Sequence, residues 1–355
     1  MNETPVLRDT SSRAVGLSPR VIEAHGVAIP VIEARSQTQA ERGLQAANPI
    51  LIAGGWSTDE KTYAGLQEAL ARSGRMVVTL GHPRRGGTYP TERSEQTVGI
   101  PDVEWMKAQN ILGYVGNEQT QEHISAEGVS RKFDVFAHSE GAINALMAAC
   151  ENPEKFGNIV LFGPGGLQGK DAVLKLIMRF GGKMVTEQID AKRPRATMLR
   201  DRYDRQRRRA HLGPSDADTP GGVGASWSEP AAVQKQLQEG MSPLSKYFLA
   251  NVQRAIREGR AIAETDILAM LEYVRSQGVK IVVMQGVDDK AIPVKKVSAH
   301  LAQGMDTDRA GLNKFIDGVV TVPMLHDDPI QHPDAVAPAV AAILDTLNNP
   351  PEIQR

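Results

Sequence analysis

Short apolar runs recur along the chain and alternate with longer segments in which apolar residues return at helical spacing. Continuous apolar runs of this length are typical of strands buried on both faces of a sheet. They fall at residues 20–34 (a hairpin around Gly26), 48–56, 75–80, 132–137, 158–163, 280–286 and 318–323, and helical patterns at 58–74, 103–127 and 333–348. Because buried strands separated by helices form parallel sheets, the sequence predicts an α/β fold with a mostly parallel central sheet flanked by helices.

The first predicted helix carries signals for both of its ends. Thr58 stands where a hydroxyl can cap the amino terminus, and Gly74 stands where a glycine can end the helix. We therefore expect Thr58 to be the capping residue.

A stretch of more than one hundred residues between Phe162 and Lys280 interrupts the alternation, because it contains helical patterns but no convincing strand. Connections between elements of one domain are rarely so long. We therefore expect a core at residues 20–165 and 278–355, an inserted helical cap or lid at 166–277, and a flexible leader at 1–19.

The composition is that of an ordinary globular protein. Apolar residues make up 41% of the chain, charged residues 23%, and the net charge is -1, so nothing favours a nucleic-acid partner. The single cysteine, Cys150, excludes an intrachain disulfide and is typical of a reducing compartment, so we expect a cytoplasmic protein. The first twenty residues lack a secretory signal, and no apolar run is long enough to span a bilayer. Monomer and dimer both stay open.

The sequence AHSEG, residues 137–141, lies where a predicted strand meets a predicted helix. Ser139 occupies the turn, and the small residues Ala137 and Gly141 stand two positions to either side. Small residues are needed there when a strained, crowded bend lifts a nucleophilic serine clear of a sheet. The following helix would direct its positive end at the serine. A plain helix-capping serine would fit the same five residues.

The surrounding elements decide between these two interpretations. Over residues 20–165 and 278–348, the chain resembles the α/β-hydrolase superfamily. The resemblance implies a catalytic triad in the chain order Ser139, Asp289 and His326, with the acid in a turn after a late strand and the histidine after the last strand. In such a triad the histidine takes the serine proton, and the aspartate fixes the imidazole tautomer.

Some positions depart from the superfamily pattern or compete with its residues. Ala137 replaces the first glycine of the serine motif, and Leu325 replaces the glycine before the histidine. Asp288 stands beside Asp289, whose register fits the acid better, and is expected to be a solvated turn residue.

The resemblance also implies an oxyanion hole made of two backbone N–H groups. One belongs to Glu140, the residue after the nucleophile, and the other to Trp56, in the loop after the third strand. Gly54 and Gly55 precede Trp56 and allow a close backbone approach to the site, so Gly55 is also a candidate for substrate binding.

The remaining histidines and the cysteine have less specific interpretations. His82 lies in a glycine-containing loop after the fourth strand and is a candidate for the pocket wall, although a structural role is its default. His138 is expected to pack or to form hydrogen bonds beneath the site, His332 to stand at a helix start, and Cys150 to lie in the core. No spacing of His, Asp or Glu is typical of a metal site, so we expect neither metal nor cofactor.

Two segments of the insertion bear on the substrate. Residues 171–185 form an apolar helical pattern in which Ile177 and Phe180 are candidates for lining a substrate pocket, and docking on the core is the simpler alternative. Residues 192–211 contain nine Lys or Arg residues and only two Asp residues. A solvated face would explain them, and so would an anionic or carrier-bound substrate.

Together these features predict a cofactor-independent serine hydrolase that cleaves a small carboxylic ester or thioester through an acyl-enzyme. Carbon-carbon bond hydrolases and acyltransferases of the superfamily use the same residues, and some proteins of this fold bind a small ligand without turnover, so these alternatives stay open. Serine at the bend, Ser139, argues against the epoxide hydrolase and haloalkane dehalogenase branches, which carry aspartate there.

Overall fold

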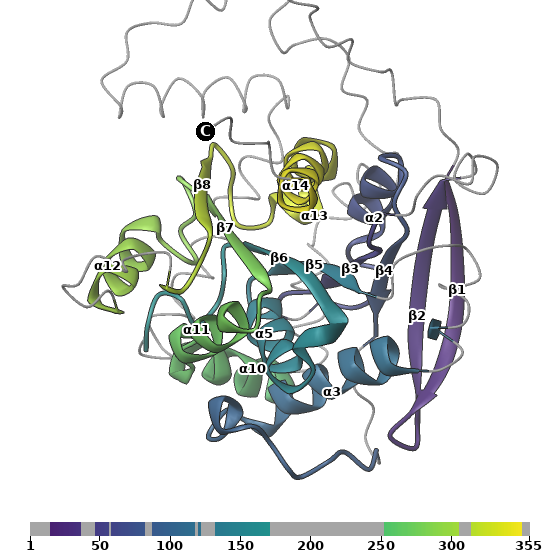
Figure 1. Ribbon diagram of the computed structural model, residues 1–355, viewed down its shortest axis with the longest axis horizontal. Coiled ribbons are helices and arrows are strands. Elements are labelled where there is room, and N and C mark those ends of the chain that lie inside the picture. The colour runs from purple at the N-terminus through teal and green to yellow at the C-terminus, as the bar shows by residue number, and fades with distance from the viewer. Residues whose placement is uncertain are drawn as a thin grey trace, which may run out of the picture.

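The structure, a computed structural model, describes residues 15–36, 47–56, 58–81, 87–117, 120–121, 132–170, 252–304 and 314–349. In these ranges eight strands form one sheet in the order β1-β2-β4-β3-β5-β6-β7-β8 (Figure 1). The strands are Val15–Ala24 (β1), Val27–Ser36 (β2), Ile50–Ala53 (β3), Val77–Leu80 (β4), Phe133–His138 (β5), Phe156–Phe162 (β6), Lys280–Gly286 (β7) and Gly318–Val322 (β8). The pairs from β4 to β8 are parallel, and β2 pairs antiparallel with both β1 and β4. The mostly parallel sheet expected from the sequence is confirmed.

Helices cover both faces of the sheet (Figure 1). One face carries Ala64–Ala71 (α2), Asp328–Gln331 (α13) and Pro333–Asn348 (α14); the other carries Asp102–Gly116 (α3), Gly141–Glu151 (α5), Val252–Glu264 (α10) and Leu268–Ser276 (α11). Val294–Gly304 (α12) follows β7, and two short 3₁₀ helices are Glu95–Thr97 (η1) and Pro153–Lys155 (η2). Within the described ranges, no helix has both the length and the apolar character needed to cross a membrane.

The apolar runs of the strands supply two cores, one on each face of the sheet. In β5, Val135 and Ala137 belong to the core beneath α3 and α5, whereas Phe136 belongs to the core beneath α2 and α14. In β3, Leu51 and Ile52 divide in the same way. Because successive side chains of a strand point to opposite faces, a strand covered on both faces must be apolar throughout, and this is why these runs read as continuous.

The amino-terminal hairpin extends further than the sequence predicted. β1 begins at Val15, so residues 15–19 of the expected leader lie in a strand and pair with residues 32–36 of β2. The hairpin turns at His25 and Gly26, whose φ angles of 54° and 69° suit the tight turns that connect adjacent antiparallel strands.

Two expected helix ends differ in the structure. Tyr63, not Thr58, precedes the first residue of α2, and the Thr58 hydroxyl donates instead to the carbonyl of Gly55 at 2.7 Å. Gly74, with a φ angle of 91°, follows the end of α2 as expected. α3 ends at Gly116, well before residue 127, because Asn117 adopts an extended backbone.

The expected insertion leaves the sheet continuous. β6 and β7 are adjacent and parallel although more than one hundred residues separate them. α10 and α11 fall within residues 166–277, which were assigned to the cap, but α10 packs against α3, and α11 packs against α5 and β7. They therefore belong to the helical layer of the core. The cap assignment of residues 171–251 lies outside the described residues.

A buried carboxylate ties the strands together where β5 and β6 begin. Asp134 accepts hydrogen bonds from the side chains of Asn48, Arg75, Asn158 and Asn348, all at 2.8 to 3.0 Å. The backbone N–H of Asn158 also donates to Asp134 at 2.9 Å. The side chains of Asp134 and Arg75 are 0% and 4% exposed, so their charges compensate each other out of contact with water.

Replacing Asp134 with alanine should lower the free energy of unfolding by about 3–5 kcal/mol, because it leaves the Arg75 guanidinium buried without its carboxylate. Arg260→Ala is the matched control, since it removes an exposed ion pair with Glu264 and should cost less than about 0.5 kcal/mol. Urea unfolding monitored by circular dichroism measures both. Equal losses in the two variants would contradict the role given to Asp134.

Candidate active site

The backbone turns sharply at Ser139, between the end of β5 and the start of α5. Its φ angle is 56°, a conformation that residues with a side chain rarely adopt. Neighbouring backbone fixes it, because the Ser139 N–H donates to the carbonyl of Phe162 at 3.0 Å and the N–H of Gly165 donates to the Ser139 carbonyl at 2.8 Å. The strained bend expected at this serine is present.

Gly141 explains why small residues surround the bend. A Cβ atom at this position would lie 2.1 Å from the carbonyl oxygen of Ala53, inside the backbone of β3. Ala137, on the other side, is fully buried between β3 and β6. The first turn of α5 can therefore press against β3 only if position 141 has no side chain.

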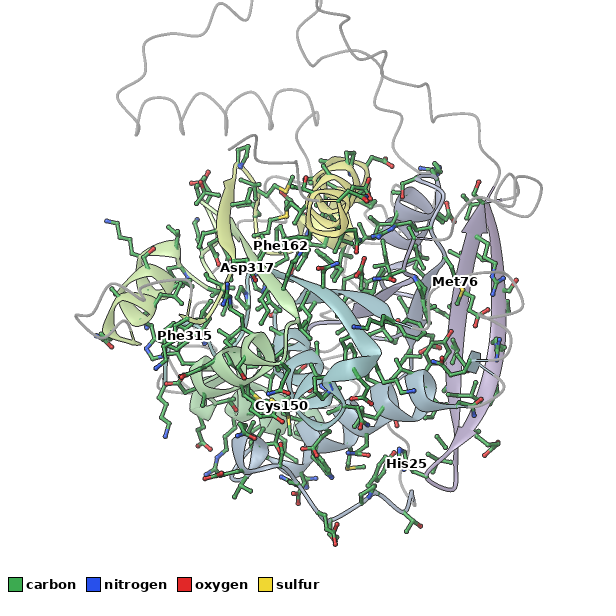
Figure 2. The ribbon with its side chains drawn as sticks, in the orientation of Figure 1. His25, Met76, Cys150, Phe162, Phe315 and Asp317 are labelled. Atoms are coloured by element: carbon green, nitrogen blue, oxygen red, sulfur yellow. The ribbon has the colours of Figure 1, made fainter. Side chains whose placement is uncertain are left out.

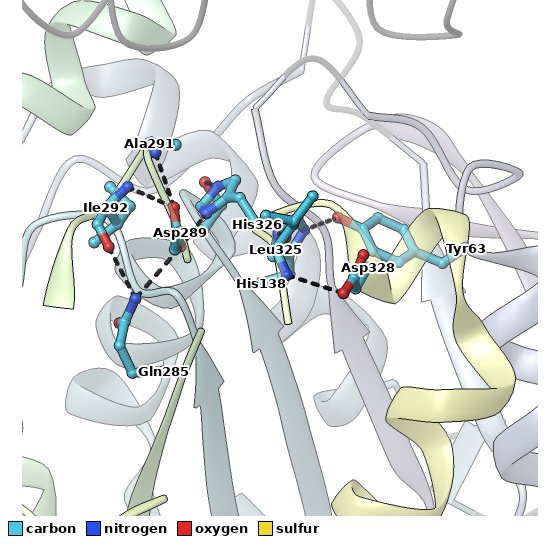
Figure 3. Close-up of polar contacts among 10 residues, drawn as sticks. Tyr63, His138, Gln285, Asp289, Ala291, Ile292, Leu325, His326 and Asp328 are labelled. Carbon is cyan, nitrogen blue, oxygen red and sulfur yellow. Dashed lines mark hydrogen bonds and ion pairs between the residues drawn. The ribbon is translucent and has the colours of Figure 1, made fainter. Parts of the chain in front are cut away.

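The structure brings Ser139, Asp289 and His326 together in one hydrogen-bonded row. Nε2 of His326 lies 2.8 Å from the Ser139 hydroxyl. Nδ1 of His326 lies 2.7 Å from Oδ2 of Asp289 (Figure 3). The three residues come from the turns after β5, β7 and β8, and each is at most 4% exposed.

The hydrogen bonds determine which nitrogen of His326 carries the proton. A carboxylate only accepts, so Nδ1–H of His326 donates to Asp289. In the neutral imidazole Nε2 is then the acceptor, and it faces the hydroxyl of Ser139. This is the protonation state that a general base needs in order to remove the serine proton.

The carboxylate of Asp289 is held by its own turn. Oδ1 accepts the backbone N–H groups of Ala291 and Ile292, each at 2.8 Å (Figure 3). The side-chain amide of Gln285 donates to Oδ2 at 3.4 Å and to the carbonyl of Ile292 at 2.8 Å. The backbone thus orients Asp289, and not Asp288, toward the histidine.

The loop after β6 approaches the site in a way that the sequence did not reveal. A Cβ atom on Gly163 would lie 2.8 Å from Oδ2 of Asp289 and 3.0 Å from Nδ1 of His326. The φ angle of Gly163 is 49°, which also favours glycine. This loop can therefore cover the histidine–aspartate hydrogen bond only because residue 163 has no side chain.

The loop of residues 54–56, which we call the oxyanion loop after the role expected for it from the sequence, lies against Ser139. A Cβ atom on Gly55 would lie 3.0 Å from Cβ of Ser139, so a side chain at this position would be crowded against the serine. The Gly55 N–H donates to the Tyr63 hydroxyl at 2.8 Å and is therefore already engaged. The two donors expected from the sequence, the backbone N–H groups of Trp56 and Glu140, thus belong to segments adjoining Ser139.

A buried ionic cluster lies beside the bend and was not predicted. Nζ of Lys107 lies 2.7 Å from Glu140 and 3.0 Å from Glu258, and both carboxylate side chains are 0% exposed. Glu104, one helical turn before Lys107 on α3, is also fully buried. Burial and the negative charge of Glu140 raise the pKa of Glu104 well above its ordinary value, and burial raises that of Glu140.

The secondary candidates take the positions that the sequence suggested. His138 is 2% exposed and forms two hydrogen bonds beneath the site, and His332 directly precedes the first residue of α14. Cys150 lies in the helical layer away from the site (Figure 2), where burial raises its pKa to about 12. The remaining calls, which lie outside the described residues, are His82, Ile177, Phe180 and the basic segment 192–211.

Among the residues that the structure describes, one group of side chains has the proximity of a metal site, but its histidine nitrogens are already engaged. Ligand atoms of His138, His326 and Asp327 lie within 4.8 Å of one another. Both ring nitrogens of His138 and of His326 are engaged in hydrogen bonds to protein groups. The geometry therefore favours a hydrogen-bonded network over metal coordination at this point.

Comparison with known proteins identifies the fold. No family model matches the sequence, and no curated protein matches it. A bacterial membrane phospholipase A matches the structure with a TM-score of 0.53 and 17% identity, over 94% of this chain and 87% of that chain. An esterase from Thermogutta terrifontis matches with a TM-score of 0.50 and 12% identity, over 94% of this chain and 99% of that chain. An epoxide hydrolase from Vigna radiata matches with a TM-score of 0.50 and 13% identity, over 93% of this chain and 98% of that chain. The chain has the α/β-hydrolase fold.

Replacing Gly141 with alanine should lower the free energy of unfolding by about 3 kcal/mol, because the new methyl group overlaps the backbone of Ala53. Gly116→Ala, at the end of α3 in open space, is the control and should be neutral or stabilising by up to about 1 kcal/mol. Urea unfolding compares the two variants. A Gly141→Ala protein as stable as the control would show that the bend is not crowded.

Glu104 should make stability depend on pH. Because its pKa is raised in the folded protein, it keeps a proton that the unfolded chain releases, and the stability it contributes falls as pH rises above its ordinary value of 4.5. Glu104→Gln cannot ionise, so its stability relative to wild type should increase from about pH 5 to about pH 8, by up to about 1.4 kcal/mol per pH unit.

The measurement is urea unfolding of both proteins across that pH range, with Glu264→Gln as the control. Glu264 is 45% exposed, so its removal should shift the whole curve without changing its slope. Parallel curves for Glu104→Gln and wild type would mean that this carboxyl ionises normally in the folded protein.

Proposed function

We propose that the protein is a serine hydrolase that cleaves a carboxylic ester or a thioester through an acyl-enzyme. The observation that carries the proposal is the continuous row of hydrogen bonds from Ser139 through His326 to Asp289. The α/β-hydrolase fold supports it, since the row lies where three loops at the carboxyl ends of parallel strands meet. The row fits nucleophilic catalysis without a cofactor.

In the first half of the reaction, the Ser139 oxygen attacks the carbonyl carbon of the substrate while Nε2 of His326 takes the hydroxyl proton. The carbonyl oxygen becomes an oxyanion, and we assign its stabilisation to the backbone N–H groups of Trp56 and Glu140. The carbonyl then re-forms, the bond to the leaving alcohol or thiol breaks, and the imidazolium returns its proton to that group.

In the second half, a water molecule attacks the acyl-enzyme and gives a proton to His326. The second tetrahedral intermediate collapses, the carboxylic acid leaves, and Ser139 recovers its proton from the imidazolium. Asp289 stabilises the imidazolium in both halves through the hydrogen bond to Nδ1. The amino-terminal end of α5 adds a positive partial charge next to the nucleophile.

Several reactions share this machinery. Carbon-carbon bond hydrolysis and acyl transfer would use Ser139, Asp289 and His326 in the same roles. They differ from ester hydrolysis in the bond of the substrate that is cleaved and in the molecule that accepts the acyl group. The epoxide hydrolase with the same fold does not alter the proposal, because likeness at 13% identity concerns the fold and this chain has serine at the bend. We expect a small-molecule substrate. We propose the cytoplasm as the compartment because the single cysteine, Cys150, is free and buried, which is typical of proteins from a reducing compartment.

A fluorophosphonate probe and p-nitrophenyl esters of graded chain length test the proposal together. The wild-type protein should bind the probe covalently and hydrolyse at least one ester. Ser139→Ala should abolish labelling, and Ser139→Ala or His326→Gln should lower kcat by about 10⁴-fold or more. Asp289→Asn should lower kcat by about 10⁴-fold, because it favours the wrong tautomer of His326.

Asp288→Asn is the matched control for the acid, since it changes the adjacent carboxylate and should leave kcat nearly unchanged. The opposite result, with only Asp288→Asn inactive, would reassign the acid. A folded wild-type protein that neither reacts with the probe nor hydrolyses any ester or acyl-CoA would favour a ligand-binding function over an enzyme.

A further inference from the structure

A chain of hydrogen bonds links the oxyanion loop to the other parts of the proposed catalytic site. The N–H of Gly55 donates to the Tyr63 hydroxyl at 2.8 Å, and this hydroxyl lies 2.6 Å from Nδ1 of His138. Nε2 of His138 lies 2.7 Å from the backbone carbonyl of His326, and the side chain of His326 reaches Ser139 at 2.8 Å. The peptide bond between residues 138 and 139 closes a ring through His138, His326 and Ser139, and Tyr63 and Gly55 branch from it at His138.

The direction of each hydrogen bond follows from the groups involved. A backbone carbonyl only accepts, so Nε2–H of His138 donates to His326. In the neutral imidazole Nδ1 is then an acceptor, and the Tyr63 hydroxyl donates to it while accepting from Gly55. Burial raises the pKa of Tyr63, so its hydroxyl keeps the proton that this arrangement requires.

Rigid neighbours hold Tyr63 in place. It is 1% exposed and lies at the amino-terminal end of α2, which packs against α14. The turn before it is closed by Asp59, whose carboxylate accepts the N–H groups of Lys61 and Thr62 at 3.1 and 2.9 Å. The rings of Tyr63 and His138 (Figure 3) pack in a T-shaped arrangement, with an interplanar angle of 73°. The Tyr63 hydroxyl is therefore held in place, and the oxyanion loop binds to it through the N–H of Gly55.

We propose that Tyr63 and His138 are positioning residues that hold the oxyanion loop at a fixed distance from Ser139 and His326. The inference rests on the proposed serine hydrolase function. Neither residue exchanges a proton with the substrate. Because the Gly55 N–H is turned toward Tyr63, the loop is oriented before substrate arrives. The next N–H, that of Trp56, is the one to which the proposed function assigns the charge that develops on the carbonyl oxygen.

Tyr63→Phe removes one oxygen atom from the ring and is the direct test. It should lower kcat by about 10-fold with KM changed less than about twofold, because the loop matters most in the transition state. Complete loss of an oxyanion donor typically lowers kcat by about 10²- to 10³-fold, so a donor that is present but less well positioned should lower kcat by less. The affinity of a boronic acid inhibitor, which forms a tetrahedral adduct with the serine, should fall in parallel with kcat.

Tyr114→Phe is the matched control. Tyr114 is also fully buried, and its hydroxyl donates to Glu33 at 2.9 Å on the face of β2, away from the site. Both variants lose one buried hydroxyl and should lose similar stability in urea unfolding, but only Tyr63→Phe should lose kcat and inhibitor affinity. Equal kinetics in the two variants, or a loss of stability alone, would overturn the positioning role.

Hydrogen exchange tests the contact without relying on catalysis. The amide of Gly55 should exchange slowly in the wild type and in Tyr114→Phe, and faster in Tyr63→Phe, since only that variant frees the Gly55 N–H. A wild-type protein inert toward fluorophosphonate would reject the hydrolase proposal, whereas one that reacts at the same rate as Tyr63→Phe would reject this inference alone.

Discussion

The left-handed backbone of Ser139 is the constraint on which the site depends. A residue with a Cβ atom reaches a φ angle of 56° only where its surroundings compensate the strain. Here the compensation comes from backbone contacts to Phe162 and Gly165, and from Gly141, which lets the first turn of α5 touch β3. The strained turn therefore exists only when β3, β5 and β6 are already assembled, so the position of Ser139, the proposed nucleophile, is a property of the sheet.

The parallel sheet then determines what can reach that nucleophile. His326 and Ser139 are 187 residues apart in the chain, yet their side chains lie at hydrogen-bond distance because both follow strands that end at the same edge. Gly163 follows β6 and has no side chain, so it leaves room for the contact between Asp289 and His326. Glycines at 55, 141 and 163 have one physical role in common, since each allows backbone to approach a side chain or strand more closely than a methyl group permits.

Apart from Ser139, Asp289 and His326, which the family resemblance supplied, the sequence predicted what is local or apolar and missed the long-range polar contacts. The strands around Ser139 were readable because both of their faces are buried, whereas residues 15–19 of β1 were missed because that edge strand is largely exposed. Thr58 was expected to cap α2 from its residue type, but its hydroxyl donates instead to the carbonyl of Gly55, three residues earlier in the loop. The contact of Tyr63 with His138 spans 75 residues and leaves no periodic signal, so only the coordinates reveal it.

The buried charges beside the bend follow from the chemistry proposed for it. Glu140 is both the residue assigned to stabilise an oxyanion through its N–H and a fully buried carboxylate, and an uncompensated negative charge there would oppose the oxyanion. Lys107 compensates this charge at 2.7 Å. Burial and the negative charge of Glu140 raise the pKa of Glu104, which favours the protonated form of this third carboxyl. Lys107 also binds Glu258 on α10, so the electrostatic balance of the bend requires that helix to be docked. The segment that returns from the long insertion thereby becomes part of the environment of the nucleophile.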